Sequence, residues 1–136
     1  MVLDASMALS WLMERTARPE RARAAAVLDS LASSAAVVPA LWFTEIENAC
    51  LVAERRRIVT PAQTTDFLNR LSALPVSVDT SSPQSRRDGI LGLGRAHALS
   101  AFDATYLELS MRLGVALATF DQGLTRAAGA VGVETR

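Results

Sequence analysis

Short apolar runs alternate along the chain with longer stretches in which apolar residues recur at helical spacing. The short runs predict strands at five places: 1–4, 35–38, 75–78, 115–119 and 131–134. The stretches between them predict helices over 6–13, 20–31, 41–56, 60–71, 81–93, 100–114 and 121–128. Strands that alternate with helices in this way predict an α/β fold, in which helices cover both faces of a parallel sheet of four to five strands.

Length and composition favour one cytoplasmic domain. The chain has 136 residues, half of them hydrophobic, without an internal repeat or linker, so we expect a single domain over 1–136. Its single cysteine, Cys50, excludes an internal disulfide and fits a reducing compartment. No apolar run approaches the roughly 20 residues of a membrane span, and residues 1–13 lack the basic start of a signal peptide.

The charge balance excludes a global attraction for nucleic acid. Lysine and arginine together number 14, matching the 14 acidic residues, and all of the basic residues are arginine. With a formal net charge of zero, any contact with phosphate has to be local. Three arginine clusters could make one, although helix capping or solvation is the simpler explanation of each: Arg15, Arg18, Arg21 and Arg23; Arg55, Arg56 and Arg57; Arg86 and Arg87.

The stretch 100–123 carries two separated aspartates that the fold should bring together. Ser100 has the hydroxyl of an N-cap, Asp103 falls in the first helical turn, and Gly114 is a helix stop. Asp121 directly follows the apolar run at 115–119. A helix that feeds a parallel strand starts at the edge where that strand ends, so we expect Asp103 and Asp121 to lie close in space.

Two further carboxylates map to the same edge. Asp4 ends the first strand, and Glu45 lies in the first turns of the helix that leaves the second strand. Right-handed crossovers place both at the carboxyl ends of the strands, where open α/β sheets bind their ligands. Glu45 borders the apolar stripe of its helix, so it can face a cleft, and Asn48 could orient Glu45 or a bound water.

Four carboxylates at one place predict a cation. Like charges in a shared pocket keep some carboxyl groups protonated unless a positive charge is present. Carboxylate oxygens are the ligands that Mg²⁺ and Mn²⁺ prefer, and such a site suits phosphoryl chemistry. Ser6 and Thr119 each flank a carboxylate, so they could hydrogen-bond the waters of a bound ion or cap the helices that follow.

The order Asp4, Glu45, Asp103, Asp121 resembles the PIN domain, and within it the VapC-type toxins of bacterial toxin–antitoxin pairs. The matching segments are VLDASMAL at 2–9, PALWFTEIENAC at 39–50, LSAFDATYLELS at 99–110 and ATFDQGL at 118–124. The ending RAAGAVGVETR resembles the final helix and strand of that family. The resemblance covers essentially the whole chain and implies a three-layer α/β/α domain.

The resemblance also implies an activity and partners. It implies a Mg²⁺- or Mn²⁺-dependent ribonuclease whose metal-binding, catalytic quartet is Asp4, Glu45, Asp103 and Asp121. Ser6, Thr119 and Asn48 match the polar neighbours that assist at the cofactor site. The expected partners are an RNA substrate, a second copy of the chain in a homodimer, and a small cognate antitoxin; no membrane is expected.

Four other interpretations fit parts of the sequence. A phosphoacceptor receiver domain needs a lysine, and this chain has none. A metal-dependent adhesion module would use Asp-x-Ser-x-Ser, but Ala8 stands where its second serine belongs. A PIN nuclease that acts outside a toxin pair, in RNA processing or repair, stays open. So does an inactive PIN domain kept for protein binding, although the intact quartet argues against it.

Overall fold

A four-stranded parallel sheet forms the centre of the computed structural model, which describes residues 1–13 and 17–136. Its strands are β1 (Val2–Leu3), β2 (Ala36–Val38), β3 (Val76–Val78) and β4 (Leu117–Ala118), in the order β3-β2-β1-β4. Val2 pairs with Val37 of β2 on one side and with Leu117 of β4 on the other. The first strand of the chain therefore lies in the middle of the sheet.

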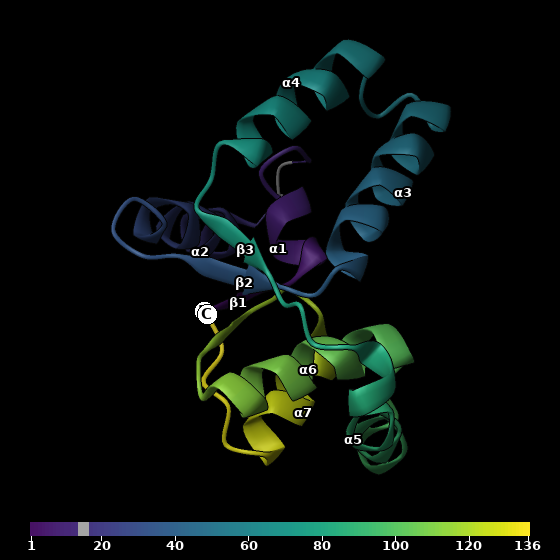
Figure 1. Cartoon of the computed structure of the whole chain (residues 1–136). Coiled ribbons are helices and arrows are strands. Elements are labelled where there is room, and N and C mark those ends of the chain that lie inside the picture. The colour runs from purple at the N-terminus through teal and green to yellow at the C-terminus, as the bar shows by residue number, and fades with distance from the viewer. Residues whose placement is uncertain (14–16) are drawn as a thin grey trace.

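Helices cover both faces of this sheet, which confirms the predicted three-layer α/β arrangement. Figure 1 shows α1, α3 and α4 on one face and α5, α6 and α7 on the other. The helices are α1 (Ala5–Leu9), α2 (Arg18–Ser30), α3 (Leu41–Arg55), α4 (Pro61–Ser72), α5 (Pro83–His97), α6 (Ala101–Leu113) and α7 (Gln122–Ala130). Within the described ranges, none of these helices is long and apolar enough to cross a membrane.

The core lies where α3 and α6 meet the two central strands. Its largest fully buried side chains include Trp42 from α3, Tyr106 and Leu107 from α6, and Leu117 from β4. Gly114 ends α6 in a left-handed conformation, with φ of 63°, as its position in the sequence predicts. That stop turns the chain from α6 directly into β4.

Three predicted boundaries are wrong. The last strand, predicted at 131–134, is reduced to one bridge between Leu117 and Thr135, because the chain turns at Val131 and Gly132 and meets β4 only at Glu134 and Arg136. The first helix begins after Asp4 rather than at Ser6 and ends at Leu9. The helix α5 continues through its glycines to His97, because contacts along its length with α6 outweigh their low helix propensity.

Candidate functional site

Asp4 is a buried carboxylate held by two hydroxyl groups. It follows β1 directly, and only 5% of its surface is exposed. Its Oδ2 accepts hydrogen bonds from the Ser6 hydroxyl at 2.5 Å and from the Thr119 hydroxyl at 2.6 Å. The Ser6 oxygen accepts in turn from the backbone N–H of Phe120 at 2.9 Å. Ser6 and Thr119 therefore fix the orientation of Asp4 and tie it to the loop after β4.

Burial raises the pKa of Asp4, because removal from water penalises the charged form. The hydrogen bonds from Ser6 and Thr119 oppose this rise, while the negative charge of Asp103 adds to it. Asp103 therefore lies within electrostatic reach of Asp4, although the two are far apart in the sequence. A carboxyl group with this pattern of support and repulsion is typical of a functional site.

Glu45 is the second carboxylate of the group, on the first turns of α3. The Tyr106 hydroxyl donates a hydrogen bond to its Oε2. Burial raises the pKa of Glu45, the Tyr106 bond opposes this, and the charges of Asp4 and Asp103 raise it further. Burial and the neighbouring Glu45 also raise the pKa of the Tyr106 hydroxyl, so Tyr106 stays a hydrogen-bond donor.

Asp103 and Asp121 each sit at the start of a helix. The backbone N–H of Asp103 donates to the Ser100 hydroxyl at 3.1 Å, which confirms Ser100 as the N-cap of α6, and that hydroxyl donates to Asp103 Oδ2 at 2.6 Å. Asp121 caps α7 by accepting from the N–H of Leu124 at 2.6 Å. Its own N–H donates to the Thr119 hydroxyl at 3.0 Å, so Thr119 links Asp121 to Asp4.

The charges of Asp4 and Asp103 thus act on Glu45, and that of Asp103 acts on Asp4, while the Thr119 hydroxyl bonds both Asp4 and the N–H of Asp121. Across residues 1–13 and 17–136, no group of three or more acidic, histidine or cysteine side chains is gathered closely enough to hold a metal ion. The chemistry of the donors still fits a hard divalent cation, because they are carboxylates that repel one another. The quartet as a set of metal ligands stays a prediction.

The hydrogen bond to Glu45 comes from a residue that the sequence analysis missed. Asn48 is exposed on α3, whereas Tyr106 of α6 reaches Glu45 from the opposite side of the sheet edge. A tyrosine three residues after Asp103, and therefore on the same side of the helix, was the available signal. A buried tyrosine hydroxyl needs a partner, and the acidic edge supplies one.

Arg23 of α2 holds the loop that follows β4. Its guanidinium donates to the backbone oxygens of Thr119 at 2.9 Å and Arg136 at 2.5 Å, and lies 5.1 Å from the centre of the Phe120 ring. This part of the first arginine cluster therefore contacts the protein itself, while Arg15 lies outside the described residues. Arg55, Arg56 and Arg57 are exposed at the end of α3.

The raised pKa values of Asp4 and Glu45 predict that the stability of the fold decreases as pH rises. Between about pH 4, where these groups titrate in an unfolded chain, and their raised folded values, the folded state binds more protons than the unfolded state. The free energy of unfolding should therefore decrease as pH rises through this range. Urea denaturation between pH 4.5 and 8 with EDTA would measure it, and Asp4→Asn should make the decrease smaller. An equal slope in both proteins would contradict the shift at Asp4.

A parallel sheet with carboxylates at the carboxyl ends of its strands defines a class of α/β domains that bind ligands at that edge. The model of the family described as "PIN domain" matches residues 1–130, so this chain belongs to the PIN domain family. PIN domains form a nuclease superfamily, and this membership supports an enzyme that hydrolyses nucleic acid. Comparison with curated proteins found no match.

Two solved structures share the fold. PAE2754 from Pyrobaculum aerophilum has 22% sequence identity and a TM-score of 0.64, over 98% of this chain and 81% of that one. FitAcB from Neisseria gonorrhoeae has 16% identity and a TM-score of 0.63, over 98% of this chain and 94% of that one. At these identities the likeness is one of fold.

Proposed function

We propose that this protein is a Mg²⁺- or Mn²⁺-dependent endoribonuclease, the toxin of a VapBC-type toxin–antitoxin pair. The observation that carries the proposal is the buried Asp4, oriented by two hydroxyls and repelled by Asp103. A charged carboxylate that is buried near a second negative charge destabilises the folded protein, and a bound cation would offset that loss of stability. Family membership supports the nuclease class, and the resemblance of the motifs supports the toxin assignment.

The four carboxylates would hold the ion, with Asp4 as its most rigid ligand. Ser6 and Thr119 keep Asp4 in one orientation, and Ser100 does the same for Asp103. Tyr106 holds one oxygen of Glu45 and leaves the other available to a ligand. When bound, the ion would polarise the phosphate and offset the negative charge that builds up on it.

The reaction requires a base as well as a cation. During hydrolysis, the oxygen of water bonds to phosphorus, the bond from phosphorus to a sugar oxygen breaks, and the water loses a proton. Glu45 is suited to accept that proton, because its raised pKa brings its basicity closer to neutral pH. Its Oε2 is occupied by Tyr106, so the other oxygen would hold the ion through a water molecule and would take the proton from that water.

Purified protein should cleave single-stranded RNA with Mn²⁺ or Mg²⁺ and lose that activity in EDTA. The added ion should also raise the melting temperature of the protein, because it binds the folded state and relieves the repulsion among the carboxylates. Gel analysis of a labelled RNA, beside a DNA of the same sequence, measures the first effect and calorimetry the second. Undiminished cleavage in EDTA would overturn the metal dependence, and preferred cleavage of the DNA would overturn the RNA assignment.

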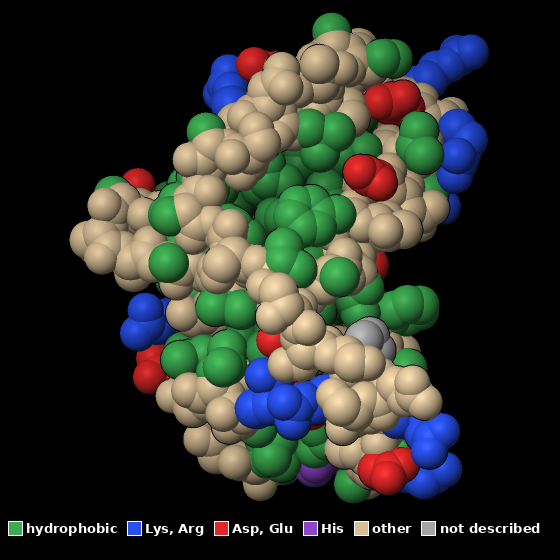
Figure 2. All heavy atoms as spheres, viewed as in Figure 1, with side chains coloured by type: hydrophobic (Ala, Val, Ile, Leu, Met, Phe, Trp, Pro, Cys, Tyr) green, Lys and Arg blue, Asp and Glu red, His purple; other side chains and the backbone are tan. Residues whose placement is uncertain are grey.

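An apolar groove between α3 and α4 supports a protein partner. It encloses about 320 Å³ and is lined by side chains that include Trp42, Phe43, Leu68 and Leu71. Figure 2 shows hydrophobic side chains gathered in this hollow between the two helices. Trp42 is almost completely buried, yet its indole N–H has no hydrogen-bond partner within the described part of the protein. Glu47 also lines the groove and adds a negative charge.

The occupant that fits this groove is a segment of the antitoxin with apolar side chains and a basic residue for Glu47. An exposed apolar hollow is typical of a surface that a partner covers. A PIN nuclease that works alone, in RNA processing or repair, would have no such partner. A short reading frame directly beside the gene, whose product binds this groove, would therefore support the toxin over a nuclease that works alone.

We propose a homodimer as well. The surface formed by α5 and α6 supports it, because Leu91, Met111 and Leu113 on these helices are each about two-fifths exposed. Side chains of this kind are commonly covered at interfaces between copies of a chain. Light scattering of the purified protein at several concentrations would give the oligomeric state directly.

A further inference from the structure

A second hollow lies beside the acidic residues, on the part of the sheet edge near β3. It encloses about 140 Å³ between the turn after β2, the loop after β3, the first half of α5 and the middle of α6. Pro39, Leu41, Ile90 and Leu109 contribute apolar walls, and Arg86 and Glu108 contribute charged groups. The mixture of apolar walls with a few polar groups is typical of a site for a small organic ring.

The charged groups of this hollow are held in a fixed network. Arg112 of α6 donates to Asp79 at 2.6 Å and to Glu108 at 3.0 Å, and Asp79 also accepts from the hydroxyl of Ser81 at 3.0 Å. Burial opposes ionisation of Asp79, but the bonds from Arg112 and Ser81 lower its pKa overall. Arg112 is therefore already paired with two carboxylates.

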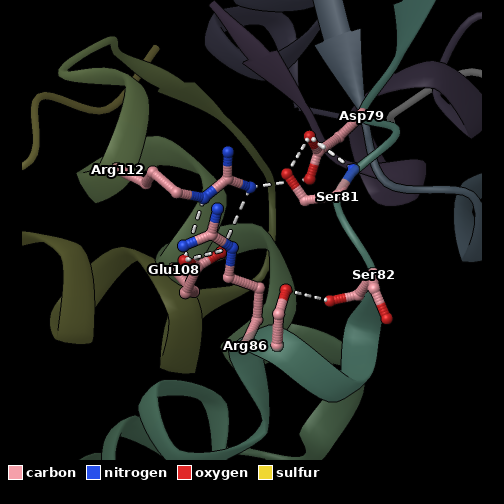
Figure 3. Close-up of polar contacts among 7 residues, drawn as sticks. Asp79, Ser81, Ser82, Arg86, Glu108 and Arg112 are labelled. Atoms are coloured by element: carbon pink, nitrogen blue, oxygen red, sulfur yellow. Dashed lines mark hydrogen bonds and ion pairs between the residues drawn. The ribbon is translucent and has the colours of Figure 1, made fainter.

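Arg86 is the member of the network that the protein leaves incompletely bonded. Its nearest carboxylate is Glu108, with 3.9 Å between Nε and Oε1, which is beyond hydrogen-bond distance. The Nε atom is buried and has no partner among the described residues. Figure 3 shows the Arg86 and Arg112 side chains converging on Glu108, with Asp79 and Ser81 beside them. The Nε atom itself is out of reach of a ligand, but the Arg86 side chain is 38% exposed and lines the hollow, so the outer part of its guanidinium is available to a ligand there.

The hollow adjoins the acidic site at the carboxyl edge of the sheet. Leu41 lies one turn before Glu45 on α3, which is roughly 6 Å along the helix axis. Pro39 and Asp79, which also line the hollow, follow β2 and β3 at the edge of the sheet where Asp4 follows β1. A nucleotide next to the one whose phosphate is cut would therefore come within reach of this hollow.

We infer that this hollow is a binding subsite for one unstacked pyrimidine base of the RNA strand, next to the cleaved bond, with Arg86 as its specificity-determining residue. The inference rests on the proposed nuclease function. A cavity of about 150 Å³ is known to hold a benzene ring, so the volume of about 140 Å³ admits a single ring. Bare phosphate fits poorly, because Asp79 and Glu108 would repel it. A pyrimidine edge offers both an acceptor for Arg86 and a donor for a carboxylate such as Glu108.

The test measures binding and cleavage separately. Cytidine and guanosine are titrated into the wild-type protein in EDTA, with amide NMR signals of Ile90, Thr105 and Leu109 as the readout. Cytidine should shift these signals saturably and bind at least tenfold more tightly than guanosine. With Mn²⁺, RNAs that differ in one base beside the cut should be cleaved at least tenfold faster with a pyrimidine there, measured as kcat/KM.

The variants are Arg86→Gln, Arg86→Lys and, as the matched control, Arg87→Gln. Arg87 carries the same charge on the next position of α5, but its side chain is 69% exposed and lies near Asp88. Both Arg86 variants should lose the preference for the pyrimidine, including the lysine variant, which keeps the charge and lacks the planar donor. Arg87→Gln should keep it. Variants with a native melting temperature and an unchanged base preference would overturn the subsite.

Failure of the subsite is distinguishable from failure of the nuclease. If cytidine binds in a way that depends on Arg86 but the protein cuts no RNA, the subsite is supported and the proposed nuclease activity is wrong. Metal-dependent cleavage without cytidine binding, or with equal binding of guanosine, would retain the nuclease and overturn the subsite.

Discussion

Replacement of Asp4 by asparagine should reduce RNA cleavage about 100- to 10,000-fold, the range for loss of a group that acts directly at the reacting centre. Asparagine has the same shape and can still accept hydrogen bonds from Ser6 and Thr119, but it brings no negative charge to a cation. Burial already disfavours the charge of Asp4, so the variant should fold, with a stability in EDTA equal to or above that of the wild type. Initial rates of cleavage of a labelled RNA in Mn²⁺ give the effect.

The matched control is Asp88→Asn on α5, where the side chain is 96% exposed. It removes the same charge far from any buried partner and should leave the rate within about twofold, because exposed substitutions of this kind change little. Equal cleavage by Asp4→Asn and the wild type would place the chemistry elsewhere on the molecule.

Replacement of Phe43 by aspartate should abolish stable binding of the antitoxin. Phe43 lines the α3–α4 groove, is 45% exposed and packs edge-on against Trp42. Truncation of a central aromatic residue at an interface costs about 2 kcal/mol or more, and an added carboxylate beside Glu47 would repel a basic partner. We expect at least about a 30-fold weaker complex. Co-purification with the product of a short neighbouring reading frame, followed by calorimetry, measures it.

Leu51→Asp supplies the comparison on the same helix. Leu51 is 52% exposed and does not line the groove, so it introduces the same charge outside the binding surface. That variant should bind the antitoxin like the wild type. Loss of binding in both variants would point to a general effect on α3, and binding retained in Phe43→Asp would place the partner elsewhere.

Topology made much of the site predictable from the sequence. Asp4 directly follows the first apolar run, and Glu45 comes soon after the second. Asp103 lies at the start of the helix that leads into the run at 115–119. The rule that parallel strands end at one edge is sufficient to bring such residues together. The electrostatic influence of Asp103 on both Asp4 and Glu45 agrees with it.

The features that the sequence did not reveal depend on packing between elements. The bond from Tyr106 to Glu45 requires the angle between α3 and α6, which spacing along either helix does not give. The same holds for Arg86, whose unpaired Nε arises from the way α5 lies against α6. The prediction of the last strand failed for a local reason, because the chain turns at Val131 and Gly132 before it reaches β4.

The central place of β1 has a consequence for biosynthesis. Its partner β4 begins at Leu117, so β1 completes its pairing only after the segment that contains β4 has been synthesised. Two of the four carboxylates of the proposed site, Asp103 and Asp121, also lie far from β1 in the sequence. We therefore expect the proposed site to assemble only once the segments that carry β4 and α7 have left the ribosome.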